Sequence, residues 1–463
     1  MKERNTVKPF GFSDKIGYMF GNFGNDFTFL LSSMMLMKFY SDVMGVSVAL
    51  VGTMMMAARF VDAFTDIAMG QIVDRSKPGK KGKFIKWIKL VAGPIALASF
   101  LMYASWFKDM PMAFKIFWMF FTYILWGSVF YTAINIPYGS MASAVSADPN
   151  DRAELSNWRT IGTALASAAI GVVLPLFVFY TDANGNQVLS GNRMMIAALV
   201  CSIAAFVCYM LCYNLVTERV KIEQKTEKFD LKKLLKGVAT NKALIGIVAS
   251  SIAMLLVQLT VATMAGYVFP NYFGNIKAQS AANLLGTVVI LICAGFTVKL
   301  SQRYGRKEVS IAAAIFGAVI YFAAYFTQTT NAWVFVGFYG VSYIGIAIFN
   351  LICWAMITDV IDDTEVKTGE RSDGTIYAVY SFARKLGQAA SSGLSGFLLS
   401  IVGYTQATAF DPEVVNGIYD VTCLVPAIGY ILLALVLFFL YPLSRGRVEK
   451  NAKILAEKRA ISE

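Results

Sequence analysis

The chain has 463 residues, of which 57% are hydrophobic and only 15% are charged. Because a soluble protein of this length carries roughly 25% charged residues, the composition excludes an ordinary soluble protein and indicates an integral membrane protein. The net charge of +12 predicts no nucleic-acid partner, because the basic residues gather in short segments between apolar stretches.

Apolar stretches of about 20 residues, the length needed to cross a bilayer as a helix, recur along the whole chain. Charged segments, or breaks that contain glycine and proline, separate them. The sequence therefore predicts an all-α membrane protein with twelve transmembrane helices, near residues 12–40, 47–73, 87–106, 112–146, 155–180, 193–216, 243–272, 281–302, 308–327, 331–360, 373–403 and 417–442.

The basic residues predict the orientation of these spans. About 33 of the 41 lysines and arginines fall on one side of the membrane when the N-terminus is placed inside, and about five fall on the other side. This positive-inside pattern predicts a multi-pass protein of the cytoplasmic (inner) membrane with both termini in the cytoplasm. The first eleven residues are polar and the first span is far longer than a signal-peptide core, so we expect that span to remain as a transmembrane helix.

A long charged segment divides the spans into two sets of six. We expect an N-terminal half at 1–216, a cytoplasmic linker at 217–242 near anionic headgroups, and a C-terminal half with a cytoplasmic tail at 243–463. A basic loop recurs at the same place in each half, after residues 70–75 and within residues 299–307. This repeat resembles the major facilitator superfamily, whose halves are parallel repeats that rock around a site near the middle of the membrane.

Asp26 and Arg159 are charged residues at the first and fifth predicted spans. Asp26 stands alone among apolar residues, and Arg159 opens its span after a charged loop. A carboxylate accepts two hydrogen bonds from vicinal sugar hydroxyls, and a guanidinium donates in a fork, so the pair could clamp a pyranose. A structural ion pair between the two residues, or an interfacial anchor at Arg159, is the alternative.

Asp62 and Asp66 lie one helical turn apart in the second predicted span, with Arg59 on nearly the same stripe. Ionisable groups at bilayer depth are expensive, so they usually face a cavity, pair with one another and mark an ion or substrate path. With the hydroxyls of Thr65 and Thr132, the two carboxylates offer oxygen ligands for a hard cation such as Na+ or Li+. Two close carboxylates cannot both ionise cheaply, so one can carry a proton instead. A purely structural pairing of these acids with Arg59 stays open.

Six short motifs match a known family in order and spacing. They are Tyr18-Met-Phe-Gly21-Asn-Phe-Gly24-Asn25-Asp26-Phe, Arg59 to Asp66, Gly82-Lys83-Phe84, Thr122-Tyr123-Ile-Leu-Trp126-Gly127, Asn135-Ile-Pro137-Tyr138 and Asp359-Val-Ile-Asp362. Together they resemble the glycoside-pentoside-hexuronide:cation symporters of the major facilitator superfamily, over nearly the whole chain. The resemblance implies that Asp62 and Asp66 bind the coupling cation and that Asp26 and Arg159 bind the sugar.

The fourth predicted span adds Tyr131 and Asn135 to the expected substrate site. In the melibiose-carrier branch of the family, the position that matches Asn135 is acidic and the one that matches Gly139 is tryptophan. This chain has therefore lost a carboxylate and an aromatic platform, so it departs from the pattern that galactoside recognition uses.

The eleventh predicted span contributes Tyr380, Ser381, Arg384 and Lys385 to the expected substrate site. Lys385 matches the family's lysine, and Arg384 is an additional cation beside it. Because adjacent residues on a helix point about 100° apart, Arg384 either lines the cavity or faces another helix. With one negative charge lost at Asn135 and a positive one gained at Arg384, the sequence favours a β-glucuronide or related uronide, with a neutral pentoside or plant-derived glycoside as the alternative.

Charged residues flank the loop between the tenth and eleventh predicted spans, namely Asp359, Asp362, Asp363, Glu365 and Arg371. Ion pairs between them and the basic loops of the N-terminal half would close the inner mouth in the outward-facing state and break as it opens. We group Arg59 with Asp359, Asp362 and Arg371 as gating residues. A solvated charged loop is the alternative, and Trp354 and Tyr339 are interpreted as packing residues.

Together these features predict a monomeric secondary transporter that moves one glycoside with one Na+, Li+ or H+ from outside to inside. Its expected partners are the sugar, the cation and the lipid bilayer, with no cofactor besides the co-transported ion. A lysolipid transporter of a related branch is a remote alternative and would need a side opening. An enzyme is not expected, since the chain has no histidine, no metal-ligand cluster and no nucleophile motif.

Overall fold

The computed structural model of the protein describes residues 8–220, 241–369 and 373–462. The chain forms two compact units, Met1–Glu227 and Lys228–Glu463. Most of the predicted linker lies outside the described residues, so the limits of the two halves stay a prediction.

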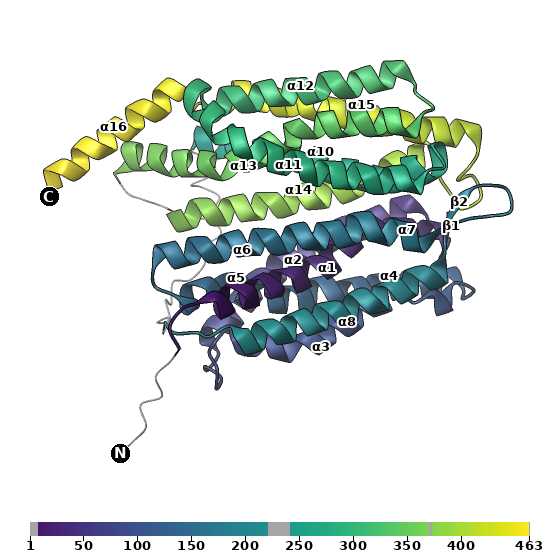
Figure 1. Cartoon of the computed structure of the whole chain (residues 1–463), viewed down its shortest axis with the longest axis horizontal. Coiled ribbons are helices and arrows are strands. Elements are labelled where there is room, and N and C mark those ends of the chain that lie inside the picture. The colour runs from purple at the N-terminus through teal and green to yellow at the C-terminus, as the bar shows by residue number, and fades with distance from the viewer. Residues whose placement is uncertain (1–7, 221–240, 370–372, 463) are drawn as a thin grey trace. The chain divides into compact units, whose positions relative to one another are not determined.

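In the described part of the N-terminal unit, the chain forms six long helical segments (Figure 1). Side chains start several of them: Ser47 accepts a hydrogen bond from the Leu50 amide at the start of the second segment, and Asp148 with Pro149 starts the fifth. The segments are α1 (Phe12–Asp42), α2 (Val48–Arg75), α3 (Ile85–Leu101), α4 (Met112–Ile124) with η2 (Leu125–Tyr131) and α5 (Thr132–Val145), α6 (Pro149–Ala168) with η3 (Ala169–Val173) and α7 (Leu174–Val178), and α8 (Gly191–Leu215); a short 3-10 turn, η1 (Ser105–Phe107), follows α3.

Among its residues that the structure describes, the C-terminal unit also has six long helical segments, and a further helix follows them (Figure 1). They are α10 (Lys242–Tyr267) with η4 (Val268–Tyr272), α11 (Ile276–Tyr304), α12 (Arg306–Thr327), α13 (Ala332–Thr368), α14 (Asp373–Ile401) and α15 (Pro412–Phe439), and the further helix is α16 (Arg445–Ser462). Among the described residues, ten of the twelve segments are long and apolar enough to cross a membrane, and the two others are α1 and α14. Both of these helices carry several of the polar residues singled out in the sequence, which lowers their mean hydropathy.

The two units repeat the same packing. In the N-terminal unit the first segment packs on the fifth and sixth, and the third packs on the sixth; the C-terminal unit has the same neighbours. Glycines permit the closest of these approaches: a Cβ on Gly21 of α1 would lie 2.5 Å from the Tyr138 ring, and one on Gly162 of α6 would lie 2.7 Å from the Met19 carbonyl oxygen. Small residues of this kind let membrane helices meet backbone to backbone.

A β-hairpin interrupts the helical pattern between α7 and α8. Strands β1 (Phe179–Thr181) and β2 (Gln187–Leu189) pair antiparallel, with Phe179 opposite Leu189. The fifth span was predicted to reach residue 180, but the helix ends at Val178. The turn explains the difference, because the Asp182 carboxylate accepts hydrogen bonds from the Asn184 and Asn186 amides and thereby fixes a tight reversal.

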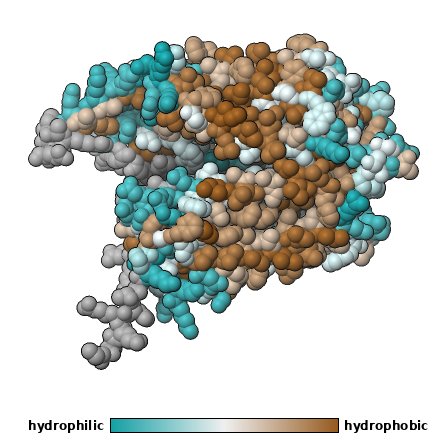
Figure 2. All heavy atoms as spheres, in the orientation of Figure 1, coloured by the Kyte–Doolittle hydropathy of each residue, from teal (hydrophilic) through white to brown (hydrophobic). Residues whose placement is uncertain are grey.

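Large apolar side chains cover the outside of the helices. Figure 2 shows brown hydrophobic surface over the middle of the helices and teal hydrophilic surface towards their ends. Leu291 of α11, Val319 of α12 and Phe438 of α15 are each more than half exposed. Apolar exposure on this scale suits helices that face lipid, so the chain is a multi-pass membrane protein.

Candidate functional site

Asp26 belongs to a hydrogen-bonded cluster that joins α1 to α6. The Asn22 amide and the Thr163 hydroxyl both donate to Oδ2 of Asp26, at 2.7 and 2.6 Å. Arg159 donates from Nε to the Asn22 Oδ1 at 3.0 Å. Asn22 therefore stands between the two charged residues, and within the described part of the chain Asp26 and Arg159 form no direct ion pair.

This cluster keeps hydrogen-bonding capacity for a ligand. Among the described residues, Oδ1 of Asp26 and the two terminal nitrogens of Arg159 have no hydrogen-bond partner, and Arg159 and Thr163 are exposed. The Arg159 guanidinium lies 5.8 Å from the centre of the Tyr138 ring, and the Tyr138 hydroxyl donates to the Tyr18 carbonyl at 2.8 Å. A fixed guanidinium and a carboxylate oxygen that face solvent are suited to vicinal hydroxyls.

Asn135 lies in a neutral polar chain beside this cluster. Asn25 of α1 donates to the Asn135 Oδ1 at 3.4 Å, and the Tyr209 hydroxyl of α8 donates to the Asn25 Oδ1 at 2.9 Å. Gly139, one turn further along α5, is exposed and has open space where a Cβ would stand. Sequence reasoning singled out Asn135 but missed Asn25 and Tyr209.

Asp62 and Asp66 face the π-helical segment η2 and the start of α5. The Ser128 hydroxyl donates to Oδ1 of Asp62 at 2.5 Å, and the Thr132 hydroxyl donates to Oδ1 of Asp66 at 2.8 Å. The other oxygen of Asp62 accepts from Arg59 at 3.2 Å. Asp62, Ser128 and Thr132 are buried. Two carboxylates and two hydroxyls thus meet between α2 and the fourth span, which is an oxygen set suited to a hard monovalent cation or a proton.

Local helix geometry brings these oxygens together. Ser128 and Thr132 are four residues apart, the same spacing as Asp62 and Asp66, so one helix presents two hydroxyls to two carboxylates of the other. Gly127 does not limit this approach, because a Cβ there would lie 3.9 Å from Oδ1 of Asp62, an ordinary van der Waals distance. π-helical turns inside longer helices often mark functional sites. The matching spacing is the sequence signal that could have identified Ser128, which sequence reasoning missed.

Arg59 and Thr65 both contact Asp62. Arg59 was grouped with the gating residues, but the structure places it against Asp62 in the oxygen cluster. The Thr65 hydroxyl donates to the Asp62 backbone carbonyl at 3.2 Å, because threonine in a helix commonly bonds back to the preceding turn. The alternative in which Arg59 pairs with the two acids for structural reasons is therefore met at Asp62, which forms an ion pair with Arg59.

Two aromatic rings join the two N-terminal clusters. The Arg59 guanidinium lies 5.3 Å from the centre of the Phe29 ring, and Phe29 stacks on Tyr131 with 5.9 Å between ring centres. Phe29 is three residues after Asp26 on α1, and Tyr131 precedes Thr132. The Asp26 cluster predicted for the sugar and the carboxylates predicted for the cation are thus neighbours within the N-terminal unit.

The predicted substrate residues of α14 lie against α13. Tyr380 is buried and its hydroxyl is 3.1 Å from the sulfur of Cys353, while Ser381 is exposed. The half-buried Arg384 places its guanidinium 5.9 Å from the centre of the Trp354 ring. Arg384 thus contacts Trp354 of the neighbouring helix α13 while part of its side chain stays exposed. The half-buried Lys385 follows on the same helix.

Trp354 and Tyr339 differ in burial, although both were interpreted as packing residues. Tyr339 is buried, whereas Trp354 is 49% exposed and meets the Tyr380 ring edge-on at 5.2 Å. Tyr339 therefore lies in the core, and Trp354 packs on Tyr380 from a half-exposed position. One turn before Trp354, Asn350 donates from its side-chain amide to Oε1 of Gln258 on α10 at 3.0 Å, a polar pair that sequence reasoning also missed.

The acidic residues predicted to gate the inner mouth lie on a helix and not in a loop. Helix α13 continues to Thr368 instead of ending near residue 360, with Gly369 in a left-handed conformation at its end. Asp359 forms an ion pair with Arg306, and Arg306 also donates to the Ala355 carbonyl. Since Asp359 is buried, the solvated-loop alternative does not describe it.

Asp362 and Asp363 lie in the same acidic turn. Asp362 lines a pocket of about 210 Å³ together with Asp359 and Asn451 of α16. Asp363 is buried and accepts from Asn451 at 3.0 Å and from Arg447 at 3.2 Å. These partners belong to the C-terminal half. The remaining predicted gating residue, Arg371, lies outside the described residues.

Comparison with known proteins identifies the family. Residues 17–445 match the family model described as MFS/sugar transport protein. The uncharacterized symporter YjmB of Bacillus subtilis (strain 168) is 31% identical over 446 residues, which cover 95% of this chain and 94% of that protein. The glucuronide carrier protein homolog of Escherichia coli (strain K12) is 28% identical over 432 residues, which cover 93% and 92%.

The fold is also that of a solved transporter. The inward open conformation of the xylose transporter XylE from E. coli superposes with a TM-score of 0.66 at 13% identity, over 95% of this chain and 98% of that chain. The resemblance to the glycoside-pentoside-hexuronide:cation symporters and the all-α membrane fold, both predicted from the sequence, are confirmed. The chain belongs to the MFS/sugar transport protein family, whose members are membrane transporters and not enzymes.

Proposed function

We propose that the protein is a symporter that carries one glycoside with one monovalent cation into the cell, and that its preferred substrate is a glucuronide or a related uronide. The observation that carries the proposal is the contact between two polar clusters within one half. A carboxylate–hydroxyl cluster around Asp62 and Asp66 adjoins the Asp26 cluster through Phe29 and Tyr131.

The coupling cation is Na+, Li+ or H+, held by Asp62 and Asp66 with the hydroxyls of Ser128 and Thr132. Arg59 competes for the same site, because it already supplies a positive charge to Asp62. A cation that enters replaces that charge, and the guanidinium then shifts its contact with Phe29. Cation binding at the Asp62 cluster thereby moves a residue that borders the sugar cluster. The resulting coupling free energy between cation and sugar binding acts equally in both directions.

The sugar binds at Asp26 and Arg159. Asn22 and Thr163 hold Oδ2 of Asp26, which directs the other carboxylate oxygen to a ligand hydroxyl. Arg159 is held through its Nε by Asn22, so its terminal nitrogens can donate to a second hydroxyl or ring oxygen. Asn22 is the residue that keeps acceptor and donor at a fixed separation.

A uronide is favoured by the balance of charge. Asn135 is neutral where the melibiose branch has an acid, and α14 carries the two cations Arg384 and Lys385. The name of the E. coli glucuronide carrier homolog agrees with this assignment. A neutral glycoside is the second candidate, because Arg384 already has the face of Trp354 as a partner and need not meet a carboxylate.

The test is uptake and counterflow in proteoliposomes against a panel of glucuronides, xylosides and galactosides, with and without Na+ and with and without a pH gradient. We expect the glucuronide to exchange fastest and one ion to drive its accumulation. Fast exchange of neutral glycosides alone would replace the uronide by the second candidate. If no sugar in the panel exchanges, the symporter proposal fails and a lysolipid substrate is tested next.

A further inference from the structure

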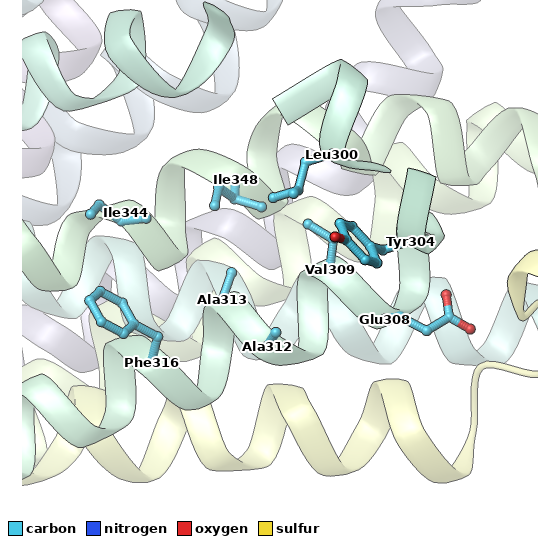
Figure 3. A pocket seen from close by; sticks show the side chains of 9 residues that line it. All are labelled: Leu300, Tyr304, Glu308, Val309, Ala312, Ala313, Phe316, Ile344 and Ile348. Atoms are coloured by element: carbon cyan, nitrogen blue, oxygen red, sulfur yellow. The ribbon is translucent and has the colours of Figure 1, made fainter. Parts of the chain in front are cut away.

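A groove of about 390 Å³ opens on the C-terminal half where α11, α12 and α13 meet (Figure 3). Its walls are almost entirely apolar, and its polar residues gather at the end where α11 passes into α12. It is lined by Leu300 and Tyr304 of α11, Ala312 and Phe316 of α12, and Ile344 and Ile348 of α13.

The groove is open because of how α11 and α12 are joined. The connection is a single residue, Gly305, whose φ of +103° is costly for a residue with a side chain. Beyond this junction at Gly305, which we call the vertex, the two helices pack on α13 far more than on each other. The wedge between them is left unfilled, and its floor includes the small side chains of Ala312 and Ala313.

The vertex end of the groove has charges of both signs, the Glu308 carboxylate among its lining residues and the Arg303 guanidinium beside Tyr304. Arg303 lies with its guanidinium 5.3 Å from the centre of the Tyr304 ring, and in the part of the chain that the structure describes it forms no ion pair. Glu308 is the acid at this end. Figure 3 shows its carboxylate extending away from the apolar side chains, and it accepts from the Arg445 amide at 3.4 Å. The Tyr304 phenol therefore lines the end of an apolar groove, with the Arg303 guanidinium beside the phenol and the Glu308 carboxylate directed towards Arg445.

We propose that this groove binds one acyl chain of an anionic phospholipid, with the lipid phosphate at Arg303 and Tyr304. The surrounding surface is lipid-facing, since Val298 of α11 and Val319 of α12 are 60% and 57% exposed. An occupant that reaches the groove through the bilayer must have an apolar chain, and the mouth selects a negative headgroup. Basic pockets between membrane helices bind such headgroups.

The experiment titrates delipidated full-length protein with phosphatidylglycerol or phosphatidylcholine of identical acyl chains and follows the first bound lipid by native mass spectrometry. We expect phosphatidylglycerol to bind more tightly than phosphatidylcholine. Ala312→Phe, which fills the groove from an exposed position, should remove the first lipid of either kind. Arg303→Gln should weaken phosphatidylglycerol about five-fold, as expected for one basic residue at a membrane surface, and leave phosphatidylcholine unchanged.

Matched controls are Ala294→Phe, at an exposed alanine of α11 outside the groove, and Arg75→Gln, at an exposed arginine that ends α2. Both should behave like the wild type. Equal retention of the first lipid in Ala312→Phe and wild type would mean that the lipid is merely annular and would overturn the proposal. So would a lipid-free dimer that Ala312→Phe dissociates, because a second copy would then occupy the groove. Ala312→Leu, a smaller change, repeats the test if the phenylalanine variant does not fold.

Discussion

The two halves use their carboxylates in different ways. In the N-terminal half, Asp66 accepts from the Thr132 hydroxyl midway along the helices. In the C-terminal half, Asp359 is paired with the Arg306 guanidinium near one end of α13. A hydroxyl contact stabilises a carboxylate but leaves its charge in place, whereas a guanidinium neutralises it. A carboxylate held by a hydroxyl is therefore suited to binding a mobile cation. A carboxylate held by a guanidinium is suited to fastening helices together.

Asp62 combines both arrangements in one residue. One of its oxygens accepts from Ser128 and the other from Arg59. Removing one partner of a buried ion pair is expensive, so any cation that displaces Arg59 must take over its role. Asp62 is therefore the point at which a mobile cation and a fixed cation compete.

The strongest test of the comparison neutralises carboxylates in both halves. Asp62→Asn and Asp66→Asn should abolish cation-stimulated sugar binding, at least 100-fold, while sugar exchange without a gradient persists, because the sugar cluster is untouched. Asp359→Asn should keep the stimulation, since Arg306 already neutralises that acid. Sugar binding is measured by calorimetry with and without Na+ and at several pH values.

Asp74→Asn, at an exposed position near the end of α2, is the matched control and should behave like the wild type. Cation stimulation that survives in both Asp62→Asn and Asp66→Asn would remove these residues from the cation site. Loss of stimulation in Asp359→Asn would instead break the distinction between the two kinds of carboxylate.

The second test concerns the Asp26 cluster. Asn22→Ala should weaken sugar binding about as much as Asp26→Asn, because it frees Arg159 from its position relative to the carboxylate. Losing a hydrogen bond to a charged group costs roughly 1.5 to 3 kcal/mol, which corresponds to about a 10- to 150-fold weaker affinity. Calorimetry without any ion gradient measures this loss, and an unchanged affinity in both variants would make the cluster purely structural.

The sequence predicted these two clusters only in part, for physical reasons. Asp26, Asp62 and Asp66 could be identified because a charge in an apolar run is expensive and therefore informative. Asn22 could not, since small polar residues are common in membrane helices and only the packing of α1 on α6 shows what it contacts. Ser128 was missed although its four-residue spacing from Thr132 matches that of Asp62 and Asp66. The twelve-helix architecture could be predicted because span length and hydropathy are local properties. The end of α13 could not, because the helix continues beyond its apolar part through an acidic turn to Thr368.

The third test separates the halves by substrate charge. If Arg384 serves a uronide carboxylate, Arg384→Gln should weaken uptake of a glucuronide about ten-fold and barely change uptake of the neutral glucoside with the same aglycone. The guanidinium would in that case leave the Trp354 ring when substrate binds. Equal losses for the two substrates would assign Arg384 to packing on Trp354 of α13. In that case Arg384 would not distinguish a charged from a neutral substrate.

The smallest expected effect concerns how each half fastens its helix ends. Asp363 of the C-terminal half is held by side-chain donors, whereas Glu218 of the N-terminal half accepts from the backbone amides of Lys83, Phe84 and Ile85 at 2.7, 2.9 and 2.6 Å. Glu218 follows α8 and closes over the start of α3. Burial raises the pKa of Glu218 above its ordinary value of 4.5, although these amides and the Lys83 charge act to lower it.

A carboxyl whose pKa is raised by folding stabilises the native state most when it is protonated. The contribution of Glu218 is therefore fully present below about pH 4.5 and is lost as the pH rises through the raised pKa. Glu218→Gln cannot ionise, so the melting temperature of the wild type relative to this variant should fall as the pH is raised from 4.5 towards neutrality. The variant also loses contacts with the backbone amides, and this loss changes its melting temperature by the same amount at every pH. Glu413→Gln, at an exposed glutamate, should show no such trend. A difference between wild type and Glu218→Gln that is flat or rises with pH would mean that the three amides and the Lys83 charge outweigh burial in setting the pKa of Glu218.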